Sequence, residues 1–185
     1  MNHTIPWALA AVGAVVLAAM SWRSLRHPAS HGFFRFFAFL SILYLIALNV
    51  PHWFERPWSA PQLVSWTLLV ASLFPAVLGF RLLRRRGRPT TPDPGSLLMG
   101  FENTSALVTS GIYHFIRHPL YASLVCLAWG TTLKSLSWLT AGLAVVATGF
   151  LVATAKAEEV ENITRFGAAY REYMARTRLF VPFIL

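Results

Sequence analysis

Charged residues are scarce in this chain, and acidic ones most of all. Only 12% of its 185 residues are charged and 56% are hydrophobic, which gives a mean hydropathy of +0.54. An ordinary soluble domain carries roughly 25% charged residues. The composition therefore excludes a typical soluble domain and favours a membrane protein, and the length fits one domain.

Cysteine is nearly absent, and the few acids leave a strong positive charge. Cys126 is the only cysteine, so no disulfide forms within the chain. Sixteen basic residues oppose seven acidic ones, for a net charge of +9. In a soluble protein this balance would suggest nucleic acid, but here the cations flank apolar runs. We therefore expect membrane lipids as partners, not nucleic acid, and the sequence indicates no obligate protein partner.

Several common cofactor motifs are missing. The chain has no GxGxxG after a strand, no GxxxxGK[ST] loop and no GxSxG elbow, so a nucleotide cofactor would need a site of another kind. His114 and His118 are four residues apart, but Pro119 interrupts any helix through them and no Cys or Asp cluster completes a ligand set. We expect no metal site.

Long apolar runs dominate what remains. Five candidate spans cover residues 5–22, 36–54, 63–80, 120–133 and 136–155. A membrane helix needs about 20 apolar residues, so the run at 120–133 fits a re-entrant segment as well as a span. We predict an all-α, polytopic integral membrane protein with about five transmembrane helices. The last two form a helical hairpin whose turn lies at Lys134 and Ser135, where the lysine can extend to the lipid headgroups.

Arginine clusters predict the orientation. The four residues before the first run contain no Lys or Arg, whereas Arg23, Arg26 and Arg35 follow it, which argues against a cleaved signal peptide. A second cluster occupies 81–88, two spans later. Because basic loops face the cytoplasm, we expect the N-terminus outside and the C-terminus inside, in a bacterial inner (plasma) membrane.

We divide the single membrane domain into four parts: three spans at 1–86, a cytosolic loop at 87–118, the hairpin at 119–157, and a terminal segment at 158–185. The loop contains Pro89, Pro92, Pro94, Gly95 and Gly100, which predict turns, and a loose linker is the alternative. The terminal segment predicts a cytosolic amphipathic helix, because Val160, Ile163, Tyr170 and Met174 share one face. An apolar tail follows at 180–185.

The hairpin predicts a candidate site. Arg117, His118, Pro119 and Tyr121 begin one arm, and Glu158 and Glu159 end the other, so these side chains converge. Arg117 and His118 immediately precede Pro119, which suits a first helical position, and the backbone amides at this helix start are unpaired and can bind a carboxylate. The ordinary alternative is that these charges merely mark the ends of spans.

The same residues resemble a known family. The run Leu107 to Tyr113, then Arg-His-Pro-Leu-Tyr at 117–121, Glu158-Glu159 and Phe166-Gly167 with Tyr170 and Tyr173 occur in the order found in the isoprenylcysteine carboxyl methyltransferase and phospholipid methyltransferase superfamily. The resemblance covers roughly residues 100–185. It implies an integral membrane methyltransferase that uses S-adenosylmethionine and releases S-adenosylhomocysteine. The cofactor would lie in a cytosol-facing pocket, and a lipophilic acceptor would reach it from the bilayer.

The resemblance also implies roles for particular residues. Arg117 and Glu159 are the expected catalytic residues. The expected cofactor-binding residues are Leu107, Val108, Gly111, Tyr113, His118, Pro119, Tyr121, Glu158, Glu159 and Tyr170. A glutamate can bind a ribose diol or an ammonium, Arg117 can pair with a carboxylate, and tyrosine rings can shield a sulfonium by cation–π attraction. For the tyrosines, an interfacial aromatic belt is the alternative.

The acceptor stays open at this stage. An isoprenylcysteine-like carboxylate, a phospholipid amine and a hydrophobic thiol all fit, so O-, N- and S-methylation are alternatives, as are different oligomeric states. Two other functions also fit: a nicotinamide-dependent membrane reductase of the sterol-reductase type, and a non-catalytic structural or assembly protein. Ala122-Ser123 stand where many relatives have glycine.

Overall fold

The structure of the chain, a computed structural model, describes residues 4–87 and 104–181. Within these ranges the chain is helical and contains no β-strand, which confirms the predicted all-α class. The helices are α1 Thr4–Leu25, α2 His31–Asn49, α3 Ala60–Arg86, α4 Pro119–Thr132, α5 Trp138–Phe166 and α6 Ala168–Arg176, with 3-10 turns η1 Val50–His52 and η2 Gly111–His114. The turns predicted from Pro89 to Gly100 lie outside the described residues.

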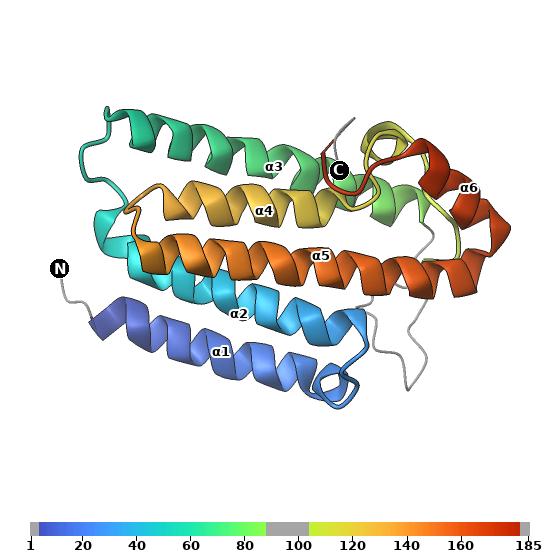
Figure 1. The fold of residues 1–185 in the computed structure, drawn as a ribbon, viewed down its shortest axis with the longest axis horizontal. Helices are drawn as coiled ribbons and strands as arrows, with labels where there is room; N and C mark the ends of the chain where they lie inside the picture. Colours follow the sequence, from blue (N-terminus) through green and yellow to red (C-terminus); the bar gives the residue numbers. More distant parts are fainter. Residues whose placement is uncertain (1–3, 88–103, 182–185) are drawn as a thin grey trace.

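The five long helices lie side by side in the order α1, α2, α5, α4, α3 (Figure 1), with α2 packed on α5 and α3 packed on α4. One end of the bundle carries the α1–α2 connection, the end of α3 and residues 104–118. Because Arg26, Arg84, Arg85 and Arg86 lie there, we call it the basic end. The opposite end carries the α2–α3 and α4–α5 connections.

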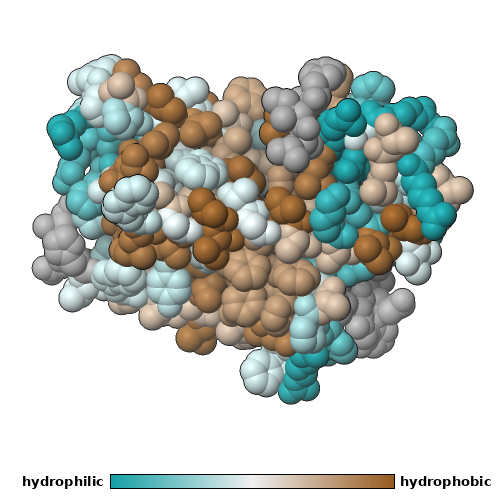
Figure 2. All heavy atoms as spheres, viewed as in Figure 1, coloured by the Kyte–Doolittle hydropathy of each residue, from teal (hydrophilic) through white to brown (hydrophobic). Residues whose placement is uncertain are grey.

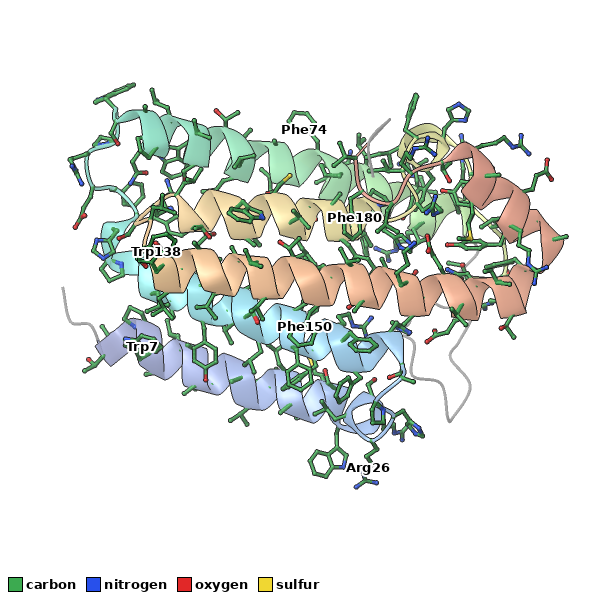
Figure 3. The ribbon with its side chains drawn as sticks, viewed as in Figure 1. Trp7, Arg26, Phe74, Trp138, Phe150 and Phe180 are labelled. Atoms are coloured by element: carbon green, nitrogen blue, oxygen red, sulfur yellow. The ribbon has the colours of Figure 1, made fainter. Side chains whose placement is uncertain are left out.

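Four helices, α1, α2, α3 and α5, are long and apolar enough to cross a membrane. Helix α4 has 14 residues and spans about 21 Å, less than the ~30 Å of a bilayer core, so the count of five spans stays a prediction. Apolar side chains cover the middle of the molecule, and hydrophilic ones gather at both ends, including the basic end (Figure 2). Phe74 points outward from α3 and Trp138 begins α5 at the opposite end (Figure 3).

Local signals set the helix ends. Ser137 and Thr140 form a capping box at the start of α5, and Pro119 is the first residue of α4. Helix α5 continues without a break past Glu158 to Phe166. It ends at Gly167, whose φ of 60° is open to glycine. The single amphipathic helix expected after Glu158 is therefore two pieces: the last turns of α5, and the separate helix α6.

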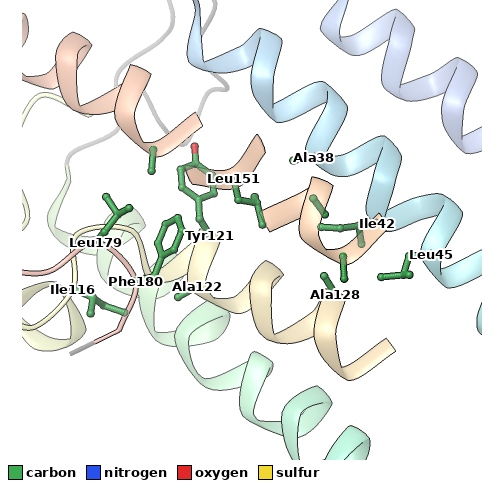
Figure 4. Packing of buried hydrophobic residues seen from close by; sticks show 13 residues of the cluster. Ala38, Ile42, Leu45, Ile116, Tyr121, Ala122, Ala128, Leu151, Leu179 and Phe180 are labelled. Atoms are coloured by element: carbon green, nitrogen blue, oxygen red, sulfur yellow. The ribbon is translucent and has the colours of Figure 1, made fainter. Parts of the chain in front are cut away.

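Small residues allow the helices to approach closely. Ala38, Ala128, Ala144, Ala147 and Ala155 are fully buried where α2, α4 and α5 meet (Figure 4). Short side chains at such contacts are typical of packed membrane helices. Near the basic end, a Cβ on Gly79 of α3 would come within 2.9 Å of the Pro119 ring. The absence of a side chain at Gly79 therefore lets the start of α4 lie close to α3.

The hairpin turn lies at Lys134 and Ser135, as predicted. The lysine does not extend to the headgroups, however. Lys134 is buried. Its Nζ donates to Gln62 Oε1 at 2.9 Å, and this Nζ also lies 3.4 Å from the centre of the Trp66 ring. The hydrogen bond and the cation–π contact hold the ammonium inside and tie the turn to α3.

Candidate functional site

Arg117 and Glu159 meet at the basic end, as the hairpin predicted. Arg117 precedes α4 and Glu159 lies on α5, and Arg117 Nε donates to Glu159 Oε1 at 2.6 Å. The two side chains are only 8% and 4% exposed. An ion pair this well buried is part of the packed interior, so the alternative of exposed charges marking a span end does not describe it.

The remaining contacts of these two residues are also with protein. Arg117 Nη1 donates to the Thr177 carbonyl at 2.5 Å and to the Met174 carbonyl at 3.3 Å, just beyond and within α6. Lys156 Nζ lies 3.0 Å from Glu159 Oε2. Arg117 therefore joins α5 to the end of α6, and Glu159 has a cation on each carboxylate oxygen.

The backbone amides of Arg117 and His118, just before α4, are occupied by protein. The amide of Arg117 donates to the Arg178 carbonyl at 2.8 Å, and that of His118 donates to the Leu179 carbonyl at 3.1 Å. The segment after α6 thus lies along the segment before α4, with an isolated parallel bridge between Ile116 and Arg178. These two amides are not available to a ligand.

Glu158 takes a different position from its neighbour. Tyr121 OH donates to Glu158 Oε2 at 2.7 Å, and His118 Nδ1 lies 3.7 Å from the same oxygen. The His118 and Tyr121 rings stack 5.5 Å apart, with Phe180 edge-on to the imidazole (Figure 4 shows Phe180 beside Tyr121). Glu158 keeps 26% of its side chain exposed, so this carboxylate remains accessible.

His118 has one ring nitrogen available. Its side chain is buried, and Nε2 has no hydrogen-bond partner among the residues that the structure describes. Glu159 Oε1 lies 3.8 Å from Nε2, which is too far for a hydrogen bond. Nδ1 likewise lies 3.7 Å from Glu158 Oε2, so each ring nitrogen is beside a carboxylate but beyond hydrogen-bond distance, and Nε2 can exchange a hydrogen bond with a ligand.

A first cavity lies under the chain before η2, and we call it the loop cavity. The cavity opens to solvent, and its empty space together with that open solvent is about 530 Å³. Loop residues, the end of α5 and α6 form its walls. The lining residues are Leu83, Thr104, Ala106, Leu107, Val108, Tyr113, Arg117, His118, Glu158, Asn162, Phe166, Tyr170 and Tyr173.

A second cavity lies between α2 and α4, and we call it the interhelical cavity. Its empty space, together with open solvent, is about 490 Å³. Most of its lining surface is apolar. The lining residues are Arg35, Phe39, Tyr113, Arg117, His118, Pro119, Leu120, Tyr121, Leu124 and Glu158. Tyr113, Arg117, His118 and Glu158 line both cavities, so the two spaces share a wall.

Three buried tyrosines surround the loop cavity. Burial raises the pKa of Tyr113, Tyr170 and Tyr173, and the Glu158 carboxylate adds to the effect at the first two. Tyr173 OH donates to the Tyr113 carbonyl at 2.7 Å, which ties α6 to η2. The phenols stay protonated at neutral pH, and their packing inside the protein differs from an interfacial aromatic belt.

Most of the expected site residues lie together. Leu107, Val108 and Tyr170 line the loop cavity, Pro119 and Tyr121 line the interhelical cavity, and the four shared residues line both. Gly111 and Glu159 line neither. Gly111 has a φ of 63° and starts η2, where a Cβ would meet Leu82 at 2.6 Å, so its role there is backbone shape.

Other lining residues were not expected from the sequence. Asn162 follows Glu158 by four residues on α5, so helical spacing alone would have placed it on the same face. Arg35 and Phe39 come from α2, and no local signal connected that helix with the site. In the part of the chain that the structure describes, no group of three His, Cys, Asp or Glu side chains could hold a metal ion.

The chain was compared with known proteins. The model of the family described as PEMT, phospholipid methyltransferase, matches residues 64–168, which is more than half of the chain. The match includes almost all of α3, all of α4 and all of α5, and it also includes the four residues shared by both cavities. No curated protein and no solved structure matches.

Proposed function

The chain belongs to the phospholipid methyltransferase family, and from this premise we propose that it transfers a methyl group from S-adenosylmethionine to a lipophilic acceptor that approaches from the bilayer. It is an integral membrane protein of a methyltransferase family. The proposal extends to the cofactor, the acceptor and the residues that hold them.

One observation carries the proposal: the loop cavity and the interhelical cavity share Tyr113, Arg117, His118 and Glu158. A transfer between two substrates requires two binding spaces that meet where the reacting atoms lie. One space here is rich in polar and aromatic groups at the basic end. The other is apolar and lies between helices, where a lipid substrate would be held.

The residues of the loop cavity fit S-adenosylmethionine. Leu83, Val108 and Phe166 offer apolar surface for a purine ring. Glu158 and Asn162 offer oxygens and an amide to a ribose diol or an ammonium, and Arg117 offers a guanidinium to a carboxylate. The rings of Tyr113 and Tyr170 suit a sulfonium, since cation–π attraction is worth about 0.5–2 kcal/mol.

When bound, S-adenosylmethionine supplies a methyl group on a positively charged sulfur. An acceptor lone pair would take this methyl carbon, and the sulfur would keep the electron pair of the broken carbon–sulfur bond and leave as S-adenosylhomocysteine. The chain's own residues align the partners and keep water out, which is the main requirement of such an in-line displacement. His118 Nε2 accepts the proton that an amine acceptor loses.

The family description makes a phospholipid amine the first acceptor to test. An isoprenylcysteine-like carboxylate and a hydrophobic thiol are the other two candidates. We place the basic end in the cytoplasm of a bacterial cell, with the protein in its inner membrane, because both arginine clusters lie at that end.

A transfer assay tests the proposal. The purified protein, in lipid nanodiscs, receives methyl-labelled S-adenosylmethionine with phosphatidylethanolamine, farnesylcysteine or a long-chain thiol as acceptor. We expect label in one lipid product, and loss of that product in His118→Ala. The proposal is wrong if no acceptor is labelled while NADPH binds the purified protein, which would instead support a reductase.

A further inference from the structure

An apolar groove runs along the outer side of α2, away from the basic end. Side chains of α1, α2 and α4 form it, including Leu17, Leu43, Ile46 and Leu124, and every lining residue is apolar. The α1 wall includes Val16, which is half exposed on the surface of the bundle. A groove without a single polar group has nothing to bind but hydrocarbon.

The groove continues from the interhelical cavity. Phe39 and Leu124 line both spaces, so the apolar surface passes from His118 and Glu158 to Ile46 without a polar interruption. From Arg35, at the reacting end, to Ile46, at the far end, α2 rises about 16 Å, which is about half of the ~30 Å thickness of a bilayer core. The path is therefore as deep as one leaflet.

We propose that the groove holds an acyl chain of the lipid acceptor, extended along α2 while its headgroup lies in the interhelical cavity. This inference rests on the proposed function. A lipid in the leaflet nearer the basic end has its headgroup at that end and its chains parallel to the helices. The acceptor could thus bind from its position in the bilayer, without leaving the membrane.

The groove gives a function to α1 and α2. These helices precede the matched region 64–168, yet α2 supplies one wall of the interhelical cavity. Gly13 lets α1 approach α2, since a Cβ there would come within 3.1 Å of Leu43. We infer that the two helices add the binding surface for the acceptor's chain to the cofactor-binding part of the family.

A crosslinking experiment tests the groove without relying on turnover. The protein is placed in phosphatidylcholine nanodiscs with a small fraction of phosphatidylethanolamine that carries a diazirine midway along one acyl chain. After irradiation, mass spectrometry locates the adducts. We expect adducts on Leu17 and Leu43, and we expect Ile46→Trp to reduce them by about fivefold or more, because the added ring fills the groove.

Matched variants separate a filled groove from a disturbed fold. Leu17→Trp fills the groove from the α1 side and should have the same effect. Leu73→Trp adds the same ring on the exposed face of α3 and should leave adducts at Leu17 and Leu43 unchanged. Excess unlabelled phosphatidylethanolamine should also reduce the adducts.

The proposal is overturned if Leu17 and Leu43 are labelled no more than the exposed face of α3, or if labelling is insensitive to both groove variants. It is also overturned if farnesylcysteine, and not phosphatidylethanolamine, removes the adducts, since a prenyl chain would then be the occupant. Labelling of the groove in a protein that transfers no methyl group would leave the groove standing and contradict the proposed function alone.

Discussion

The Arg117 guanidinium and the Glu159 carboxylate form a 2.6 Å ion pair that the surrounding protein buries almost completely. Glu159 also pairs with Lys156, and Arg117 also holds two carbonyls at the end of α6. The neighbouring Glu158 instead borders both cavities. Two adjacent glutamates therefore have different surroundings, one enclosed by protein and the other open to ligands.

We predict that Glu159→Gln lowers stability strongly. Removing one partner of a buried pair leaves the other charge uncompensated, at a cost of about 3–5 kcal/mol. Thermal unfolding of the detergent-purified protein measures the effect. Lys156→Gln is the matched control, because this lysine is 59% exposed and its pair should contribute only about 0–1 kcal/mol. Equal melting temperatures for Glu159→Gln and the parent would show that the pair does not support the fold.

The buried tyrosines predict a loss of stability in alkali. Burial raises the pKa of Tyr113, Tyr170 and Tyr173 in the folded protein, whereas the unfolded chain has the ordinary value of about 10. Above about pH 10 the unfolded state releases protons that the folded state keeps, so the free energy of unfolding falls as pH rises. Melting temperatures between pH 8 and 11 measure this.

Tyr173→Phe should make that decline shallower, since one of the three groups is gone. It should also cost about 0.5–1.5 kcal/mol at neutral pH, because the hydrogen bond to the Tyr113 carbonyl is lost. Tyr44→Phe on the outer side of α2 is the control. A slope identical in the parent and Tyr173→Phe would rule out this origin of the pH dependence.

Cofactor binding should order the chain before η2. Thr104, Ala106, Leu107 and Val108 line the loop cavity, so a ligand there would cover their backbone. Hydrogen exchange of peptides that cover residues 104–113 should slow when S-adenosylhomocysteine is added, while peptides from α1 stay unchanged. Exchange that is the same at saturating ligand would favour the linker interpretation of this segment.

The orientation of the chain predicts which ends can be labelled. Arg86 ends α3 at the basic end, and Ser59 precedes α3 at the opposite end. In a Cys126→Ser background, an impermeant thiol reagent applied to intact cells should label Ser59→Cys and not Arg86→Cys. Labelling of Arg86→Cys alone would show that the orientation is the reverse of the one proposed. Labelling of both variants would show that α3, which lies between the two positions, does not cross the membrane.

The sequence predicted that the site residues converge, because two apolar runs joined by the turn at Lys134 and Ser135 form a hairpin. The outer ends of the two arms of a hairpin lie side by side. It could not assign the two glutamates. Consecutive residues on a helix point about 100° apart, so the position of α4 decides which one is buried. The backbone hydrogen bond from Arg117 to Arg178 depends on packing between segments that are far apart in the sequence. The same holds for the contribution of Arg35 and Phe39 from α2. No spacing of residues in the sequence connects these segments. The family match confirms the resemblance seen in the motifs.

The most direct test of the central claim is equilibrium binding of S-adenosylhomocysteine and NADPH to the purified parent protein and to Glu158→Gln. We expect the parent to bind S-adenosylhomocysteine and not NADPH. Glu158→Gln should keep the parent's melting temperature without ligand, because the carboxylate is partly exposed. It should also lose about one to two orders of magnitude in affinity, since a hydrogen bond to a charged group contributes roughly 1.5–3 kcal/mol. A variant that binds S-adenosylhomocysteine as tightly as the parent does, or a parent that binds only NADPH, would contradict the account.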